Sequence, residues 1–354
     1  MKILVLRFSS IGDIVLTTPV VRALSQQVPG ARVHFATKPA YRGIVAANPY
    51  VTKVHCLTGS LGELVAELKA ERFDYVVDLH NNLRTGLIKL RLGVKSSSFD
   101  KLNLQKWLLV NLKIDQLPRV HIVARYLAAA APLGVTDDRQ GLDYFIPEQD
   151  EVDLAAALPA TFQRGYVAFA IGAQHATKRL PVERIIELCA LLRRPIVLLG
   201  GPEDESTGHV VELAFERNVP AVVPAPPRLP DSPYYFPPPV GEPTQLTSIY
   251  NACGKFSLNQ SASLVRQAEL VVSHDTGLMH IAAAFQKQIF SVWGNTVPEF
   301  GMYPYRSEFR VLEVPGLSCR PCSKIGYAEC PQGHFKCMRE IKFDLNLPPA
   351  RDGR

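Results

Sequence analysis

Short apolar runs alternate with amphipathic stretches along most of the chain. Runs typical of buried strands occupy residues 2–8, 32–37, 51–57, 73–80, 166–171, 196–199 and 269–273. Helical periodicity lies between or after them, at residues 14–28, 62–70, 83–92, 121–131, 182–192, 257–267 and 278–285, and a further helix begins near residue 203. Strands that alternate with helices form βαβ units, so the pattern predicts an α/β protein with parallel sheets.

The alternation stops in a polar stretch at residues 135–159 and then starts again. A chain of 354 residues is long for a single core, and two domains are the default expectation. We therefore expect one domain at residues 1–150 and a second at residues 151–354. The second holds a proline-rich insertion at 224–243, expected to run extended on the surface, and a cysteine-rich tail at 319–337.

The composition is that of a soluble globular protein, with 47% hydrophobic and 20% charged residues. No apolar run reaches the roughly 20 residues needed to cross a bilayer. Arg7 and Asp13 interrupt the apolar N-terminus, so this stretch does not have the pattern of a signal peptide. We expect a cytoplasmic protein.

The net charge of +6 is unevenly distributed, because the excess of basic residues lies in the first 150 residues. Residues 84–113 contain many bases and a single acid, Asp100, with leucines and Trp107 interleaved. Such a surface fits an anionic lipid interface or an acidic acceptor, and no nucleic-acid-binding motif accompanies it. The alternative is a solvated helical face beside ordinary core leucines.

Four of the seven cysteines form a cluster with the spacing C-x2-C-x7-C-x6-C. They are Cys319, Cys322, Cys330 and Cys337, with His334 among them. In a cytosolic protein such a cluster consists of free thiols or zinc ligands more often than disulfides. The first pair has the spacing of a zinc knuckle, and the second spacing is irregular, so a structural zinc site and a set of thiols both remain open.

The stretch with the clearest chemistry is Asp275-Thr276-Gly277, between a buried strand and a helix that carries His280. A strand that turns into a helix through a glycine directs unpaired backbone N–H groups and the positive end of the helix dipole at one point, which suits a phosphate. The alternative is that Asp275 or Thr276 is a simple N-cap.

Other loops place polar groups after predicted strands, where open α/β sheets bind ligands. One holds Ser9, Ser10 and Asp13, one runs from residue 172 to 179, and one reads Gly-Gly-Pro-Glu at 200–203. The chain has no G-x-G-x-x-G fingerprint, no Walker motif and no D-x-D pair, which argues against dehydrogenases, P-loop enzymes and a metal-bound diphosphate. Lys178, Arg179 and the helix end would have to neutralise the phosphates.

At this point the sequence resembles a known family. Residues 275–280, Asp-Thr-Gly-Leu-Met-His, resemble the D-[ST]-G-x-x-H signature of the lipopolysaccharide heptosyltransferases, glycosyltransferase family 9, and Arg7 to Asp13 resemble its N-terminal R-x-S-S-I-G-D signature. Residues 78–84, residues 178–181 and the cysteine tail also look like that family. The likeness runs over almost the full length and breaks at the proline-rich insertion.

The resemblance implies a GT-B fold, in which two Rossmann-like domains with parallel sheets face each other across a cleft. It also implies an inverting transfer of heptose from ADP-heptose to the inner core of lipopolysaccharide, without a metal or other cofactor. Asp13 would be the general base that takes the proton of the acceptor hydroxyl. The protein would act as a monomer, peripherally at the inner face of the cytoplasmic membrane.

Residue roles follow from the same resemblance. The N-terminal domain would bind the lipid-linked acceptor with Ser10, Asn81 and Arg84. The C-terminal domain would bind the donor with Thr177, Lys178, Glu203, Phe256, Asp275, Thr276, Gly277 and His280. Among these, Lys178, Thr276 and Gly277 would hold the diphosphate, Asp275 the heptose hydroxyls, Glu203 the ribose and Phe256 the adenine, while His280 would orient the 275–277 loop.

Two rival functions remain. One is an enzyme of the same fold that uses a different nucleotide sugar, such as another transferase or an epimerase. The other is a non-catalytic scaffold of an envelope pathway, with the cysteine tail as a zinc module and the proline-rich insertion as a docking segment. The presence of Asp13, Lys178 and Asp275 together disfavours the scaffold, which does not need them.

Overall fold

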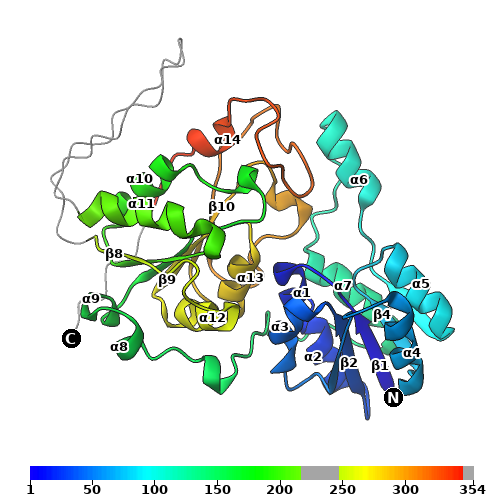
Figure 1. The fold of residues 1–354 in the computed structure, drawn as a ribbon. Coiled ribbons are helices and arrows are strands. Elements are labelled where there is room, and N and C mark those ends of the chain that lie inside the picture. The colour runs from blue at the N-terminus through cyan, green and yellow to red at the C-terminus, as the bar shows by residue number, and fades with distance from the viewer. Residues whose placement is uncertain (217–246, 346–354) are drawn as a thin grey trace.

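The computed structural model describes residues 1–216 and 247–345. They form two α/β domains that lie side by side, with the N-terminal domain in blue and cyan and the C-terminal domain in green to red (Figure 1). The predicted proline-rich insertion at 224–243 lies outside the described residues. Among the described residues, no helix is long and apolar enough to cross a membrane.

The N-terminal domain is built on a five-stranded parallel sheet in the order β3-β2-β1-β4-β5. Its strands are β1 (Lys2–Leu6), β2 (Arg32–Thr37), β3 (Lys53–Cys56), β4 (Tyr75–Asp78) and β5 (Lys95–Ser98). Its helices include α1 (Ile11–Val15), α2 (Thr18–Gln27), α3 (Arg42–Ala46), α4 (Leu61–Glu71), α5 (Leu83–Leu92), α6 (Asn103–Trp107) and α7 (Ile122–Ala130). Alternate strand residues point to opposite faces, so Ile3 and Val5 pack with α2 and α7, while Leu4 and Leu6 pack with α4.

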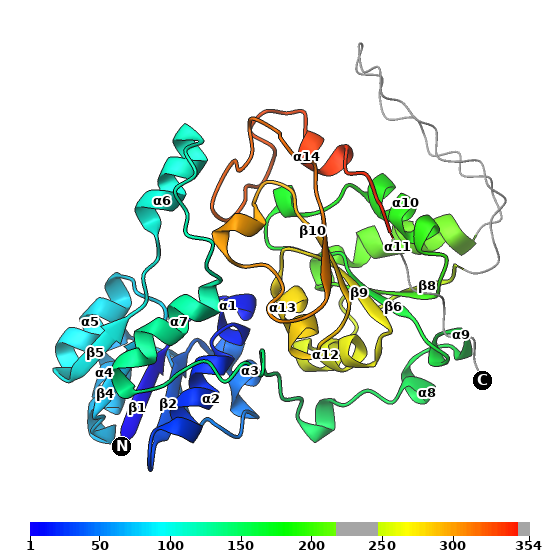
Figure 2. The ribbon, with the colours of Figure 1, turned by 180° about the vertical axis from the view of Figure 1, so that it is seen from behind.

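The C-terminal domain has a six-stranded parallel sheet in the order β11-β10-β9-β6-β7-β8. Its strands are β6 (Val167–Ala170), β7 (Ile196–Leu199), β8 (Ile249–Asn251), β9 (Leu270–His274), β10 (Ile289–Val292) and β11 (Phe309–Leu312). Its helices include α8 (Leu154–Ala157), α9 (Ala160–Gln163), α10 (Val182–Leu192), α11 (Glu205–Glu216), α12 (Leu258–Gln267), α13 (Gly277–Ala284) and α14 (Lys336–Arg339). In both views, α12 and α13 lie on the side of the C-terminal domain that faces the N-terminal domain (Figures 1 and 2).

The predicted α/β architecture with two parallel sheets is confirmed. The helix expected at residues 14–28 is divided into α1 and α2, because Pro19 occupies the start of α2, where its missing N–H costs no hydrogen bond. Four strands lacked a sequence prediction: β5, β8, β10 and β11. Of these, β5 reads Lys-Ser-Ser-Ser and lies at the edge of its sheet, where an apolar run is not required.

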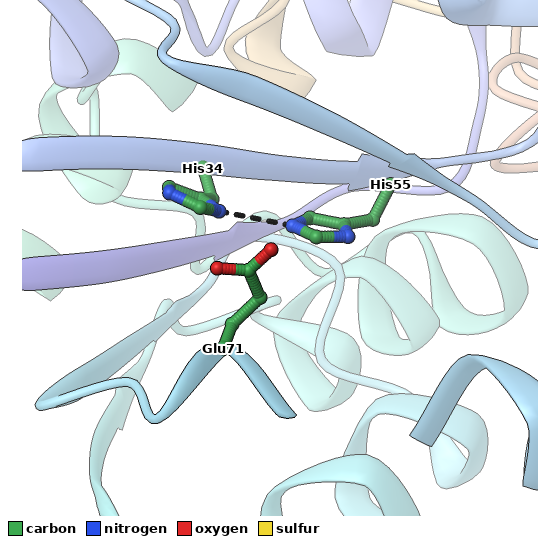
Figure 3. A group of neighbouring side chains, drawn as sticks. All are labelled: His34, His55 and Glu71. Carbon is green, nitrogen blue, oxygen red and sulfur yellow. Dashed lines mark hydrogen bonds between the residues drawn. The ribbon is translucent and has the colours of Figure 1, made fainter. Parts of the chain in front are cut away.

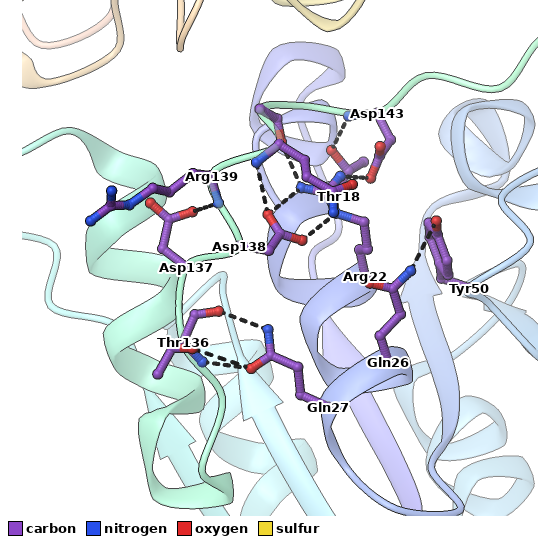
Figure 4. A network of polar contacts seen from close by, with 12 residues as sticks. Thr18, Arg22, Gln26, Gln27, Tyr50, Thr136, Asp137, Asp138, Arg139 and Asp143 are labelled. Carbon is purple, nitrogen blue, oxygen red and sulfur yellow. Dashed lines mark hydrogen bonds and ion pairs between the residues drawn. The ribbon is translucent and has the colours of Figure 1, made fainter.

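The linker between the domains is held to α2 by an ionic network (Figure 4). The buried guanidinium of Arg22 donates to both carboxylate oxygens of Asp138, at 2.6 and 2.9 Å, and to the carbonyl of Gly141 at 2.9 Å. It also forms an ion pair with Asp143. An arginine side chain that is 1% exposed is tolerated because these acceptors satisfy its donors, so the network fixes where the chain leaves the first domain.

Replacement of Arg22 should therefore destabilise the protein. We predict that Arg22→Gln lowers the free energy of unfolding in urea by about 3–5 kcal/mol, because the carboxylates keep their burial and lose their partner. The matched change Arg139→Gln, at an exposed position of the same linker, should shift it by less than about 0.5 kcal/mol. Equal stability of the two variants would show that the network does not hold the linker.

Candidate active site

Asp13 lies at the junction of the two domains, in the first helix after β1. Its Oδ1 forms an ion pair with Nη2 of Arg7 at 2.7 Å. Its Oδ2 accepts hydrogen bonds from the backbone N–H and the hydroxyl of Ser10, at 3.2 and 2.9 Å. Arg7 is itself fixed by the carbonyls of Ser9 and Leu79 and by the Tyr126 hydroxyl, so the carboxylate has one orientation.

The charge state of Asp13 follows from these contacts. Burial raises its pKa, but the charge of Arg7 and the hydrogen bonds from Ser10 outweigh that effect, and the net pKa lies below its ordinary value of 3.8. Asp13 is therefore an ionised acceptor near neutral pH. Asp13 is not the N-cap of the helix: Ser10 is the N-cap of α1 and Asp13 is its third residue, whose carboxylate accepts the Ser10 N–H. The carboxylate therefore also supports the start of the helix.

The predicted phosphate site is the N-terminus of α13. Lys178 donates to Oδ2 of Asp275 at 2.6 Å, and the hydroxyl of Thr296 donates to the same oxygen at 2.9 Å. Thr276 stands at the N-cap position without a side-chain cap hydrogen bond, and its hydroxyl lies 3.3 Å from that of Ser273. The first N–H groups of α13 are thus not capped by a side chain, which leaves them for an anion.

Two glycines let the starts of α1 and α13 touch. A Cβ on Gly12 would lie 2.6 Å from Cδ2 of His280, and a Cβ on Gly277 would lie 2.5 Å from Cγ2 of Ile11. No real Cβ makes contacts this short, so only glycine permits this approach. The contact sets Asp13 of one domain against the helix end of the other.

His280 lies inside this contact and is 2% exposed. Burial lowers its pKa to about 4, although the charges of Asp275 and Asp13 act in the opposite direction. The ring is therefore neutral near pH 7. Its position against Gly12 supports the predicted orienting role better than a role in proton transfer.

Of the expected acceptor residues, Ser10 contacts Asp13, while Asn81 and Arg84 follow β4 in the same domain. Asn81 has a left-handed backbone with a φ of 48°, held by its N–H donating to buried Asp78 at 2.7 Å and by its side chain donating to the Phe99 carbonyl at 2.9 Å. The Arg84 guanidinium stacks over the Phe8 ring at 5.7 Å. The side chain of Asn81 is thus committed to the loop, while the Arg84 guanidinium has no hydrogen-bond or ion-pair partner among residues 1–216 and 247–345.

His80 is a neighbour of this group that sequence reasoning left out. Burial and the charge of Arg7 lower its pKa to about 4, and its buried Nδ1 has no hydrogen-bond partner within the described residues. The charge of Asp13 acts on the pKa of His80 in the opposite direction.

The other residues expected to bind the sugar nucleotide differ in whether their side chains are already hydrogen-bonded within the protein. The hydroxyl of buried Thr177 accepts a hydrogen bond from the Tyr327 N–H at 2.8 Å and donates one to the Tyr327 carbonyl at 3.2 Å. This side chain is therefore bound to the cysteine-rich segment, residues 319–337. Glu203 is exposed after β7, and Phe256 is partly buried against the core. Thr177 therefore positions its loop, while the Glu203 carboxylate forms no ion pair with any residue that the structure describes.

Asp204 is the acid that sequence reasoning missed. It is 3% exposed, accepts from the Gly201 N–H at 3.0 Å and pairs with Arg179 at 3.2 Å. Arg179 also donates to the Ala173 carbonyl at 2.6 Å. Arg179 therefore orders the loops after β6 and β7. Of the two neighbouring bases, Lys178 is the one that lies near α13.

The cysteine-rich segment (residues 319–337) brings its thiols near one another without a closed ligand set. Cys319 Sγ lies 3.9 Å from Nε2 of His334, and Cys322 Sγ donates to the Cys319 carbonyl at 3.1 Å. Burial and, to a lesser extent, the nearby Cys319 raise the pKa of Cys322 to about 11. Structural zinc at Cys319, Cys322, Cys330 and Cys337 stays a prediction.

A second polar cluster lies at the edge of the N-terminal sheet (Figure 3). His34 Nδ1 lies 3.0 Å from His55 Nε2, and the ligand atoms of His34, His55 and Glu71 all lie within 4.8 Å of one another. The Glu71 carboxylate, however, already pairs with Lys2 at 2.9 Å and Lys53 at 2.6 Å. Two ammonium groups on one carboxylate oppose a cation, so we interpret the cluster as a structural network.

The geometry first defines a class. Two domains with parallel sheets, joined where the start of α1 meets the uncapped start of α13, have the architecture of the GT-B fold. The chain belongs to glycosyltransferase family 9, the heptosyltransferases, whose family model matches residues 61–224 and 242–331. This confirms the resemblance seen in the sequence.

Individual relatives agree over nearly the full length. Lipooligosaccharide heptosyltransferase 2 of Haemophilus ducreyi is 24% identical over 97% of each chain. The structure of Escherichia coli ADP-heptose LPS heptosyltransferase II matches 96% of this chain and 98% of its own, with 21% identity and a TM-score of 0.65. E. coli heptosyltransferase WaaC with ADP-2-deoxy-2-fluoro heptose matches 89% and 94%, with 22% identity and a TM-score of 0.62.

The glycine contact is directly testable. We predict that Gly12→Ala and Gly277→Ala each lower the rate of sugar transfer about 10- to 100-fold, because the added methyl separates Asp13 from the end of α13. Gly86→Ala is the matched control, since a Cβ at that helical position meets nothing within 4 Å. Activity of the two variants equal to that of Gly86→Ala would contradict the close contact.

Proposed function

We propose that this glycosyltransferase moves a heptose from ADP-heptose to the inner core of a lipopolysaccharide, with Asp13 as the general base. The observation that carries the proposal is the placement of ionised Asp13 against the uncapped start of α13. Family membership supports the type of sugar, and the E. coli neighbour bound to an ADP-heptose analogue supports the donor class.

On the donor side, the leaving diphosphate would bind to the first-turn N–H groups of α13 and to Lys178. Lys178 now pairs with Asp275, at 2.6 Å, and would share its charge between that carboxylate and the phosphates. Helix N-termini and lysines both stabilise the negative charge that develops on a departing phosphate. These groups support the prediction that no metal is needed.

On the acceptor side, Asp13 would accept the proton of the attacking hydroxyl as the new glycosidic bond forms. Attack from the side of Asp13, with the diphosphate leaving toward α13, places nucleophile and leaving group on opposite faces of the anomeric carbon. This geometry inverts the configuration at that carbon. Arg7 would keep the carboxylate ionised until the proton arrives.

If Asp13 is the general base, its replacement should slow catalysis without weakening donor binding. We predict that Asp13→Asn lowers kcat about 10²- to 10⁴-fold, the usual contribution of a general base, while the affinity for ADP-heptose stays within about twofold. Lys178→Ala should instead weaken donor binding. Calorimetry and a transfer assay separate the two effects, and a large loss of donor affinity in Asp13→Asn would show that Asp13 is structural.

Product analysis tests the sugar. Incubation with ADP-heptose and a heptose-free core acceptor should add the mass of one heptose to the acceptor. A clear preference for another sugar nucleotide would favour the rival transferase of the same fold. Membership of an enzyme family disfavours the rival scaffold.

The protein would act as a monomer, because one chain supplies both sides of the site, and would bind the inner face of the cytoplasmic membrane peripherally. The outer side of the N-terminal domain supports this: Leu83 and Leu90 of α5 are 90% and 77% exposed, and Leu104 and Trp107 of α6 are 66% and 48% exposed. Figures 1 and 2 show α5 at the outer edge of that domain and α6 projecting from one end of it. Exposed bases such as Lys95 add attraction to anionic lipid.

Membrane binding should follow these leucines. We predict that Leu83→Gln combined with Leu90→Gln reduces co-sedimentation with vesicles of anionic phospholipid several-fold, because apolar side chains and bases act together at an interface. Val210→Gln is the control, as Val210 is 48% exposed on α11 of the other domain. Unchanged sedimentation of the double variant would place the membrane contact elsewhere.

A further inference from the structure

Three loops that follow neighbouring strands of the C-terminal sheet meet at one carboxylate. The strands β10, β9 and β6 are adjacent in that sheet, and the loops after them carry Thr296, Asp275 and Lys178. Oδ2 of Asp275 accepts hydrogen bonds from both other side chains, from Lys178 Nζ at 2.6 Å and from the Thr296 hydroxyl at 2.9 Å. Among residues 1–216 and 247–345, no group donates to Oδ1 of the same carboxylate. The carboxylate is thus held through one oxygen, and its other oxygen is available to a ligand.

Thr296 is itself held in place by an arginine. It is 1% exposed, and its carbonyl accepts hydrogen bonds from Nε and Nη2 of Arg320, at 3.1 and 2.9 Å. The same guanidinium forms an ion pair with Glu313 at 2.5 Å and donates to the Val314 carbonyl at 3.2 Å. Because the guanidinium is planar and its donors are satisfied on both sides, it fixes the backbone from which the Thr296 hydroxyl reaches Asp275.

Arg320 belongs to the cysteine-rich segment, which binds the loops after both β10 and β6. In the first of these loops, the Asn295 carbonyl accepts the Cys322 N–H at 3.0 Å. In the second, which also carries the lysine, the hydroxyl of Thr177 accepts the Tyr327 N–H at 2.8 Å. The cysteine-rich segment therefore supports the two loops that supply both donors to the carboxylate.

We propose that Thr296 and Arg320 are positioning residues for the donor sugar, through which the cysteine-rich segment sets the orientation of Asp275. This rests on the proposed function, in that the Asp275 carboxylate is taken to accept hydrogen bonds from the heptose hydroxyls. With two donors on Oδ2, the carboxylate cannot rotate without breaking one of these bonds. Oδ1 therefore meets a sugar hydroxyl in a fixed geometry, as accurate placement of the sugar requires.

The two donors to Asp275 differ in what they can fix. The ammonium group of Lys178 is a point charge on a flexible chain, and in the proposed reaction it also serves the diphosphate. The hydroxyl of Thr296 sits on a β-branched side chain with few rotamers, and its backbone is held by Arg320. Thr296 is therefore the partner that keeps Asp275 oriented while the charge of Lys178 is shared with the donor.

The test separates the sugar from the nucleotide. We expect Thr296→Val, which keeps the shape of the side chain and removes its hydroxyl, to raise KM for ADP-heptose about tenfold, the effect of losing one hydrogen bond. The affinity for ADP, measured by calorimetry, should stay within about twofold, because ADP has no sugar for Asp275 to bind. Thr296→Ser should restore most of the loss. The matched control is Ser291→Ala, which removes a buried hydroxyl that donates to the Arg310 carbonyl and should change neither value.

The role of the cysteine-rich segment is tested with Arg320→Gln. This variant should raise KM for ADP-heptose about two- to fivefold and leave the affinity for ADP unchanged, because Arg320 reaches Asp275 only through Thr296. A native KM in Thr296→Val, or equal losses for ADP and ADP-heptose in that variant, would overturn the proposal. A native KM in Arg320→Gln would overturn the part assigned to the cysteine-rich segment.

Ligand-free crystal structures keep this test separate from the proposed function. If the native protein fails to use ADP-heptose, the proposed function falls, and the structures of Thr296→Val and Thr296→Ser still decide the positioning role. An Asp275 carboxylate that has turned in the first variant and kept its place in the second supports the role. The same carboxylate position in both variants overturns it.

Discussion

The contact between the starts of α1 and α13 is the constraint on which the rest of the structure depends. Each domain alone has a complete parallel sheet, but Asp13 belongs to one domain and the uncapped start of α13 to the other. Gly12 and Gly277 allow the two helices to approach, and His280 fills the space that remains. Apolar packing that runs through both domains, together with the Arg22 network on the linker, keeps this contact in place.

Charge is distributed around that contact in a way that suits group transfer. Asp13 stays ionised despite its burial because Arg7 and Ser10 stabilise its charge. Lys178 lies at the start of α13, where it forms an ion pair with Asp275. In the proposed reaction, Lys178 and this helix end would hold the leaving phosphate while the Asp13 carboxylate accepts a proton.

Much of this was predictable from local sequence. Apolar runs and helical periodicity located the central strands of both sheets, and short motifs located Asp13 and residues 275–280, because each of these features lies within a few consecutive residues. The polar edge strand β5 carried no such signal.

Features that depend on distant segments could not be predicted. Thr177 is tied to Tyr327, and Lys113 to Cys319 and Pro321, only once the chain has folded. The same holds for Asp204, whose burial distinguishes it from exposed Glu203 next to it. Leu102 and Leu109 likewise meet Val297 and Phe300 of the other domain only in the folded chain.

The central claim is that transfer takes place between Asp13 and the start of α13. A crystal structure with a non-transferable donor, ADP-2-deoxy-2-fluoro heptose, tests it most directly. We predict that the diphosphate lies against the first-turn N–H groups of α13 and Lys178, and that the anomeric carbon faces Asp13 with room for one acceptor hydroxyl. A diphosphate bound away from α13, or an anomeric carbon turned away from Asp13, would contradict the account.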